Sequence, residues 1–361
     1  MKSLIPRFKS AVRLYLQSLA SPRIATLPSD RLQLGSTVLG RSTRIPVSWA
    51  RSSAEVPFSN LGDQLSAIIV AALTKRSVSH VNFDSQDTRL TAIGSIGHQQ
   101  TAGTVHIWGT GFGSWVRNAQ GARGPFHGFP DVNYVVHALR GPFSHKILAN
   151  LGVDAPAIFG DPVWFLPRVM PERPAPRHEL GVVMHISELA EKNPRASPSP
   201  ALLKYEAGLN DHVKLISTYH DPSWGGFKQK LEEILSCRRI ISRSLHGMLI
   251  AEAYGIPCAF GPNTFYGVRH VSVEEGSNIV DPRFADAYAG YGCHDILSYG
   301  VPKRVVSDWD KIIRTIDDLW EPIPFTGREL FDAFPLPKAV KFEDEDWSLP
   351  GSLIRVLEWC D

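Results

Sequence analysis

The chain has 361 residues, with 38 Lys and Arg against 36 Asp and Glu, so no overall field recruits nucleic acid. Its 43% hydrophobic and 20% charged residues exclude a disordered chain or a fibre, and its length predicts about two domains. The four cysteines form no CxxC pair and match no zinc spacing. We therefore expect no metal centre and no disulfide framework, and we expect a reducing, cytoplasmic compartment.

The N-terminal segment, residues 1–40, is basic and amphipathic. Residues 1–29 hold five basic side chains and no acid, and apolar residues recur at helical spacing from Leu4 to Leu19. Such a helix can lie on an anionic membrane surface, so we expect residues 1–20 to attach the protein peripherally to the inner face of the membrane. The alternatives are a helix packed on the protein's own body or a frayed tail. No apolar run is long enough to span a bilayer, and no signal-peptide core is present.

Strand-like and helical runs alternate over residues 41–166, the first expected domain. The pattern predicts helices over 62–75 and 142–152, strands over 90–97, 104–111 and 134–140, and a strand followed by a turn over 157–167. Residues 167–178 contain four prolines in twelve positions, which predicts a linker.

A second alternation covers residues 179–307, the second expected domain. Strands are predicted over 179–187, 212–218, 238–244 and 256–261, and helices over 224–237 and 245–255. Residues 308–361 are predicted to form a C-terminal helix over 308–320 and an acidic tail.

Alternating strands and helices predict an α/β fold with parallel sheets and right-handed crossovers. The two alternating halves on either side of a proline linker therefore predict two Rossmann-like, doubly wound domains that face a cleft. Ligands of open α/β sheets bind beyond the carboxyl ends of the strands, so chemistry is sought where the strands end.

Three glycine-containing turns lie in the first half, one directly before a helix and two after strands. One turn, formed by Asn60, Gly62 and Asp63, precedes a helix, whose unpaired first-turn amides favour an anion. Asp63 would then hold a sugar hydroxyl or position a basic residue. The favoured alternative is that Asn60 or Asp63 is simply the N-cap of the helix. The segments around His98 and around Gly109 and Thr110 let backbone amides approach a phosphate or carboxylate. They lack the GxGxxG spacing of a dinucleotide site. His98 is either a titrating group or a structural loop histidine.

The other strand ends carry cationic and titratable groups. Arg140 closes an apolar strand, where it can grip a carboxylate or phosphate bidentately or form a structural ion pair. The strongest cluster is the turn from a buried strand into an apolar helix, and His185 is expected to face the same region. This turn contains Arg243, Ser244, Leu245, His246 and Gly247.

Six segments in order along residues 58–262 resemble the polysaccharide pyruvyltransferase family, and most closely the ketal pyruvyltransferases of bacterial exopolysaccharides. They are NLGDQLS (60–66), HIWGTGF (106–112), LRGPFS (139–144), FGDPVWFLP (159–167), MHIS (184–187) and SLHGMLIAEAYGIP (244–257). The resemblance implies a GT-B-like fold. It also implies transfer of a pyruvyl group from phosphoenolpyruvate to two hydroxyls of a sugar in a lipid-linked repeat unit, with no cofactor.

By the family pattern, Asp63, Arg140 and His246 would be catalytic. The remaining residues of these turns would bind substrate. One position departs from the pattern, because Ser244 stands where the family has an arginine. The adjacent Arg243 is the candidate to replace it, although a shift of one residue at a strand end turns the side chain to the other face.

Ketal formation needs cations for two anionic groups and a proton for the methylene carbon. Arg140, Arg243 and the helix start at His246 supply the first, and a histidine can supply the second.

Two functions from other classes remain open. One is a nucleotide-sugar glycosyltransferase that uses the same cleft, with Glu252 as the candidate acid on the ribose. The other is a non-catalytic polysaccharide-assembly protein that retains the fold, with Ser244 as a sign of lost activity.

Overall fold

Two mainly parallel sheets organise the chain. The computed structural model describes residues 43–117, 122–206, 212–274 and 280–360. The first sheet is entirely parallel and has the order β3-β1-β4-β5-β8. Its strands are β1 (Ile45–Val47), β3 (Val78–His80), β4 (Arg89–Thr91), β5 (Gly103–Trp108) and β8 (Val132–Ala138).

The second sheet has the order β10-β9-β12-β13-β15-β14, and only its edge strand β14 runs antiparallel. Its strands are β9 (Leu180–Val183), β10 (Val213–Ile216), β12 (Ile240–Ser242), β13 (Cys258–Phe260), β14 (Gly267–Ser272) and β15 (Asp295–Gly300). The mixed α/β class with parallel sheets is thereby confirmed, whereas the two-domain GT-B arrangement and its boundaries stay predictions.

Local sequence explains where the main helices begin. Pro142 occupies the first turn of α4 (Pro142–Asn150), and the Ser223 hydroxyl accepts from the amide of Gly226 at the start of α6 (Trp224–Leu235). Asp281 caps α8 in the same way by accepting from the amide of Arg283. The other helices are α3 (Leu65–Thr74), α5 (Leu166–Val169), α7 (Leu245–Ala253), α8 (Pro282–Gly290), α9 (Trp309–Leu319), α10 (Arg328–Asp332) and α11 (Gly351–Ile354).

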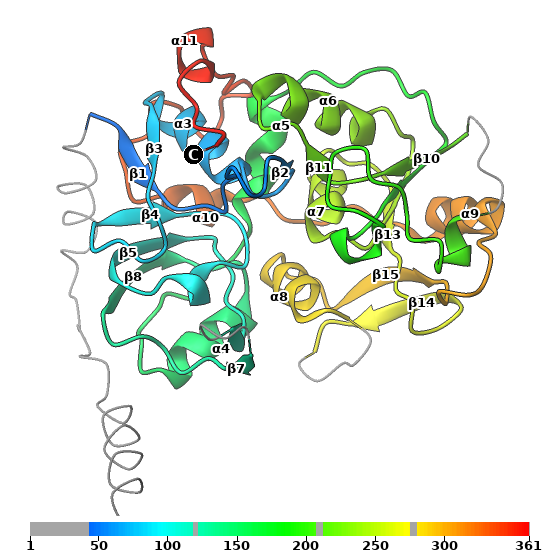
Figure 1. Cartoon of the computed structure of the whole chain (residues 1–361), viewed down its shortest axis with the longest axis horizontal. Coiled ribbons are helices and arrows are strands. Elements are labelled where there is room, and N and C mark those ends of the chain that lie inside the picture. The colour runs from blue at the N-terminus through cyan, green and yellow to red at the C-terminus, as the bar shows by residue number, and fades with distance from the viewer. Residues whose placement is uncertain (1–42, 118–121, 207–211, 275–279, 361) are drawn as a thin grey trace, which may run out of the picture.

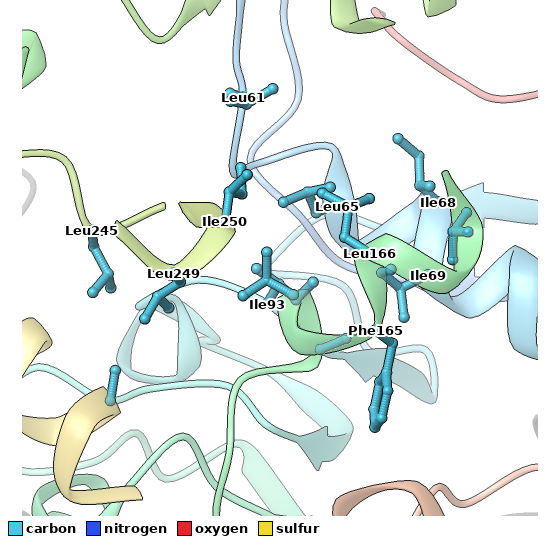
Figure 2. Close-up of a cluster of buried hydrophobic side chains, with 14 of the residues drawn as sticks. Leu61, Leu65, Ile68, Ile69, Ile93, Phe165, Leu166, Leu245, Leu249 and Ile250 are labelled. Carbon is cyan, nitrogen blue, oxygen red and sulfur yellow. The ribbon is translucent and has the colours of Figure 1, made fainter. Parts of the chain in front are cut away.

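One hydrophobic core extends from the helices of the first sheet to those of the second. Figure 2 shows side chains of α3, of α7 and of the segment around α5 converging, among them Leu65, Phe165 and Leu249. All ten residues of α3 are buried, since the helix lies inside this layer. The segment at the start of the predicted proline linker is therefore part of the core: α5 contacts both α3 and α7.

Three further contacts tie the halves together, as Figure 1 shows. The two-residue strands β2 (Ser59–Asn60) and β11 (Tyr219–His220) pair antiparallel, and α8 packs against α4. The C-terminal segment returns to the first half, where the amide of Ala339 donates to the carbonyl of Leu73. Candidate residues from both halves thus lie within one continuous framework.

Most predicted elements are present with shorter bounds. The strand predicted over 90–97 ends at Thr91, and residues 157–167 form an isolated bridge at Phe159 and the 3-10 turn η2 (Pro162–Phe165) instead of a regular strand. The segment at 1–20 lies outside the described residues. In the part of the chain that the structure describes, no helix is long and apolar enough to cross a membrane.

Candidate functional site

The turn before α3 lies directly on the imidazole of His246. A Cβ atom added to Gly62 would lie 1.8 Å from Nδ1 and 2.3 Å from Cγ of that ring, so only glycine leaves room for it. His246 sits in the first turn of α7, directly after the end of β12. The structure therefore brings together the Asn60–Asp63 turn and the histidine turn, the two motifs that the sequence placed in different halves.

His246 is neutral at pH 7. Burial, together with the positive charges of Arg140 and Arg283, lowers its pKa to about 3. Its Nε2 atom is buried and has no hydrogen-bond partner among the described residues. An unpaired buried polar atom costs about 1–3 kcal/mol, which makes this nitrogen a candidate contact for a ligand.

Asp63, the residue after Gly62, has the opposite shift. Burial raises its pKa to about 7, and a hydrogen bond with Asn60 opposes the change only in part. The helix begins at Leu65 with Gln64 as its N-cap, so neither Asn60 nor Asp63 is the N-cap. The N-cap alternative is therefore wrong, and the turn holds a carboxyl that exchanges a proton near neutral pH.

Arg140 is held in a buried ion pair between the two halves. Its Nε and Nη2 donate to Oδ2 of Asp286 at 3.0 and 2.9 Å, and both side chains are at most 2% exposed. Its Nη1 donates to Ser95, and its guanidinium packs on Gly111. Of the two roles expected for Arg140, the structural ion pair is therefore the one present here. A bound anion could contact the guanidinium only after this arrangement opened, so its role in donor binding stays a prediction.

Asp286 explains why the helices α4 and α8 meet at this point. Besides Arg140, its carboxylate accepts from the backbone amides of Phe143 and Ser144 and from the Ser144 hydroxyl. A Cβ atom on Gly141 would lie 1.7 Å from the backbone oxygen of Asp286. The N-terminus of α4 is thus occupied by a carboxylate of the chain itself.

Arg283 supplies an accessible cation beside His185. It forms a bidentate pair with Asp281 at 3.0 and 2.7 Å, its side chain is 40% exposed, and its Nη2 lies 3.3 Å from Nε2 of His185. Burial and the charges of Arg283 and Arg243 lower the pKa of His185. Its Nδ1 accepts from the backbone amide of Ser187 at 3.2 Å and lies 2.7 Å from the Ser187 hydroxyl, so His185 caps the short turn that follows it.

Arg243 faces a buried carboxylate. Its Nη1 donates to Oε1 of Glu188 at 2.9 Å, and Lys204 contacts the same oxygen at 2.7 Å. Burial alone would raise the pKa of Glu188, but these two cations outweigh it and lower the pKa to about 2. Arg243 therefore turns toward Glu188, as expected from its one-residue shift relative to Ser244, and its side chain remains 28% exposed.

Several predicted substrate-binding positions have packing contacts. The Thr110 hydroxyl is fully buried against that of Thr91, and Leu245 lies in the core. Cβ atoms on Gly109 and Gly247 would collide with Pro162 and with Val183 respectively. These contacts account for the residue types, while any role of these positions in binding stays a prediction.

His98 is held by the backbone of a neighbouring loop. Its Nδ1 accepts from the amide of Gly113 at 2.8 Å, so the neutral ring carries its proton on Nε2. Burial and the charge of Arg140 lower its pKa to about 4. The described residues contain no group of three or more His, Cys, Asp or Glu side chains that could hold a metal ion.

The residues that sequence reasoning missed are Asp281, Arg283, Asp286 and Glu188. Asp281 is the N-cap of α8, and Arg283 and Asp286 lie in that helix, an element that the patterning did not predict. An arginine and an aspartate three residues apart in a proline-initiated helix were the only local signal.

Comparison with known proteins gives one family assignment. Residues 101–260 match the family described as polysaccharide pyruvyl transferase. No curated protein matches the chain. Among solved structures, an uncharacterised protein of Klebsiella pneumoniae subsp. pneumoniae NTUH-K2044 is similar over 73% of this chain and 94% of its own, with 13% identity and a TM-score of 0.35.

Proposed function

We propose that this chain is a phosphoenolpyruvate-dependent ketal pyruvyltransferase, and the match of residues 101–260 to the polysaccharide pyruvyl transferase family supports this proposal. The acceptor is a sugar with two free hydroxyls in a repeat unit that is lipid-linked during synthesis. The observation that carries the proposal is the unpaired, buried Nε2 of His246, on which the charges of Arg140 and Arg283 act and whose ring packs against the turn that holds Asp63, a carboxyl with a pKa of about 7.

The donor has two anionic groups, so its site requires cations. Arg283 and Arg243 keep 40% and 28% of their side-chain surface, and their counter-ions Asp281 and Glu188 position them. Arg140 is held in the ion pair with Asp286 and acts on the site through its positive charge, which helps to keep His246 neutral. We assign the contact expected from the missing family arginine at Ser244 to Arg283, because it lies beside His185 and its charge acts on His246.

Proton transfer follows from the two opposite pKa shifts. Asp63, with a pKa of about 7, is partly protonated at neutral pH and can give a proton to the methylene carbon of the donor. The first sugar hydroxyl attacks the resulting oxocarbenium-like carbon and returns a proton to Asp63. His246 is neutral, and a nearby phosphate dianion raises its proton affinity.

Ring closure completes the balance. The bond between carbon and the phosphate oxygen breaks, the second hydroxyl forms the second C–O bond, and its proton leaves with phosphate through His246. Two hydroxyl protons are therefore consumed, one by the new methyl group and one by the phosphate. No redox step occurs.

Calorimetry with phosphoenolpyruvate tests the donor assignment. Arg283→Ala is expected to weaken binding at least tenfold, because charge-assisted contacts of this kind contribute about 1.5–3 kcal/mol. Arg355→Ala, which removes an exposed arginine after α11, is the matched control and should bind like wild type. Equal affinity in Arg283→Ala would reject the assignment.

A thermal-shift panel with phosphoenolpyruvate, UDP and GDP tests the proposed function against the glycosyltransferase alternative. The candidate ribose-binding acid, Glu252, is 7% exposed, and its carboxylate accepts from Tyr288 and Trp320. Stabilisation by UDP or GDP but not by phosphoenolpyruvate would favour the alternative. No response to any of the three would favour the non-catalytic reading.

A further inference from the structure

A separate cavity lies at the hairpin of β6 (Trp115–Arg117) and β7 (Arg123–Pro125). Its volume is about 640 Å³, within the usual range for ligand pockets. The 3-10 turn η1 (Gly97–Gln99) contributes to its wall. The lining residues are Phe83, His98, Gln99, Thr101, Trp115, Val116, Arg117, Arg123 and Phe129.

Trp115 is the most unusual of these side chains. It is 48% exposed, although tryptophan is normally highly buried, and the Arg123 guanidinium lies 5.3 Å from its ring centre. Its strand, β6, pairs only with β7 in the described chain. A large exposed aromatic side chain at the mouth of a cavity is typical of a recognition surface.

His98 connects this cavity to the proposed catalytic groups. Because Nδ1 accepts from Gly113 and the charge of Arg140 helps to keep the ring neutral, Nε2 carries a hydrogen-bond donor at neutral pH. Arg140 also helps to lower the pKa of His246, so the charge of one guanidinium acts on both histidines. A molecule that contacts His98 in the cavity would therefore lie near the same charge that acts on the proposed catalytic histidine.

We propose that this cavity binds a saccharide unit of the acceptor, an inference that rests on the proposed function. Aromatic faces of Trp115 and Phe129 can pack against the C–H face of a pyranose ring. Gln99, Thr101 and His98 can exchange hydrogen bonds with its hydroxyls.

The charge of the cavity agrees with this ligand class. Its described lining includes two arginines and no carboxylate, so it takes neutral or acidic sugars and excludes cationic ones. A nucleobase also stacks on aromatic rings, and uridine therefore serves as the competing probe.

Saturation-transfer NMR on the full chain tests the proposal with three probes. They are the methyl glycosides of glucose, galactose and mannose, each at up to tens of millimolar. At least one is expected to bind wild type, and Trp115→Ala should weaken that binding about tenfold or more. Tyr266→Ala is the matched control, because Tyr266 is 51% exposed on a loop outside this cavity, and it should bind like wild type.

Three results would overturn the inference. They are binding of no glycoside to wild type, unchanged binding in Trp115→Ala, and uridine binding that depends on Trp115 while no glycoside binds. Calorimetry with phosphoenolpyruvate on the same proteins separates this inference from the donor assignment. Loss of glycoside binding with unchanged donor affinity supports it. If phosphoenolpyruvate fails to bind wild type while glycoside binding depends on Trp115, the donor assignment falls and the saccharide site remains.

Discussion

Breaking the buried pair between Arg140 and Asp286 is expected to destabilise the whole fold. In Arg140→Met, Asp286 remains 2% exposed and keeps only its contacts with α4. Removing one partner of a buried ion pair costs about 3–5 kcal/mol, and the remaining hydrogen bonds place this case near the lower value. Asp286→Ala leaves Arg140 buried with Ser95 as its remaining side-chain partner in the described chain, so a similar loss is expected.

The double variant distinguishes a coupled pair from two independent losses. If the charges compensate each other, Arg140→Met with Asp286→Ala should cost about as much as either single change, which gives a coupling energy of about 3 kcal/mol. Urea unfolding measures all three free energies. Arg328→Met is the control, because its pairs with Asp332 and Glu343 are exposed on both sides and should contribute little to stability. Additive single losses, or an Arg140→Met loss as small as the control's, would refute the reasoning.

Four other outcomes can be measured directly. Gly62→Ala should lower the free energy of unfolding in urea by about 1–3 kcal/mol, because the added Cβ displaces His246. Gly225→Ala, in an open helical position, should be neutral or stabilising, and equal effects of the two substitutions would contradict the packing argument. The pKa of Asp63 near 7 predicts that pyruvyl transfer falls as pH rises above about 7, and Asp63→Asn should lose this limb together with about a hundredfold of the rate. The folded pKa of His246 near 3 lies below its unfolded value of about 6.5, so the neutral ring contributes fully to stability above pH 6.5 and less as pH falls. His246→Asn should therefore reduce by about 2 kcal/mol the decrease in the free energy of unfolding between pH 7 and pH 5. An unchanged decrease would contradict the pKa shift. Deletion of residues 1–20 should abolish salt-sensitive pelleting with anionic vesicles, and equal pelleting of both proteins would exclude the membrane contact.

The sequence by itself determined the features that depend on neighbouring residues. Apolar runs that end in glycine or a polar cluster predicted most strands, and Pro142 marked the start of α4, because these signals act within one turn or one strand. They were also sufficient to predict the α/β class and the family resemblance. Shortened bounds, as for β4, were not predictable in this way: the strand ends at Thr91 although the apolar Ala92 and Ile93 follow, because the end of a strand depends on where pairing with its neighbour stops.

Only the tertiary structure decided what the candidate groups contact. Arg140 forms an ion pair with Asp286, which lies 146 residues away in the chain. No local sequence pattern could predict this buried carboxylate partner on α8. Gly62 looked like a turn or capping residue, yet its missing Cβ makes room for His246 from the other half. The opposite pKa shifts of Asp63 and His246 arise from burial, which removes water from the charged form in both cases, and burial is a property of the assembled core. The sequence could therefore name the chemical groups, whereas their charge states and partners depend on contacts between segments far apart in the chain.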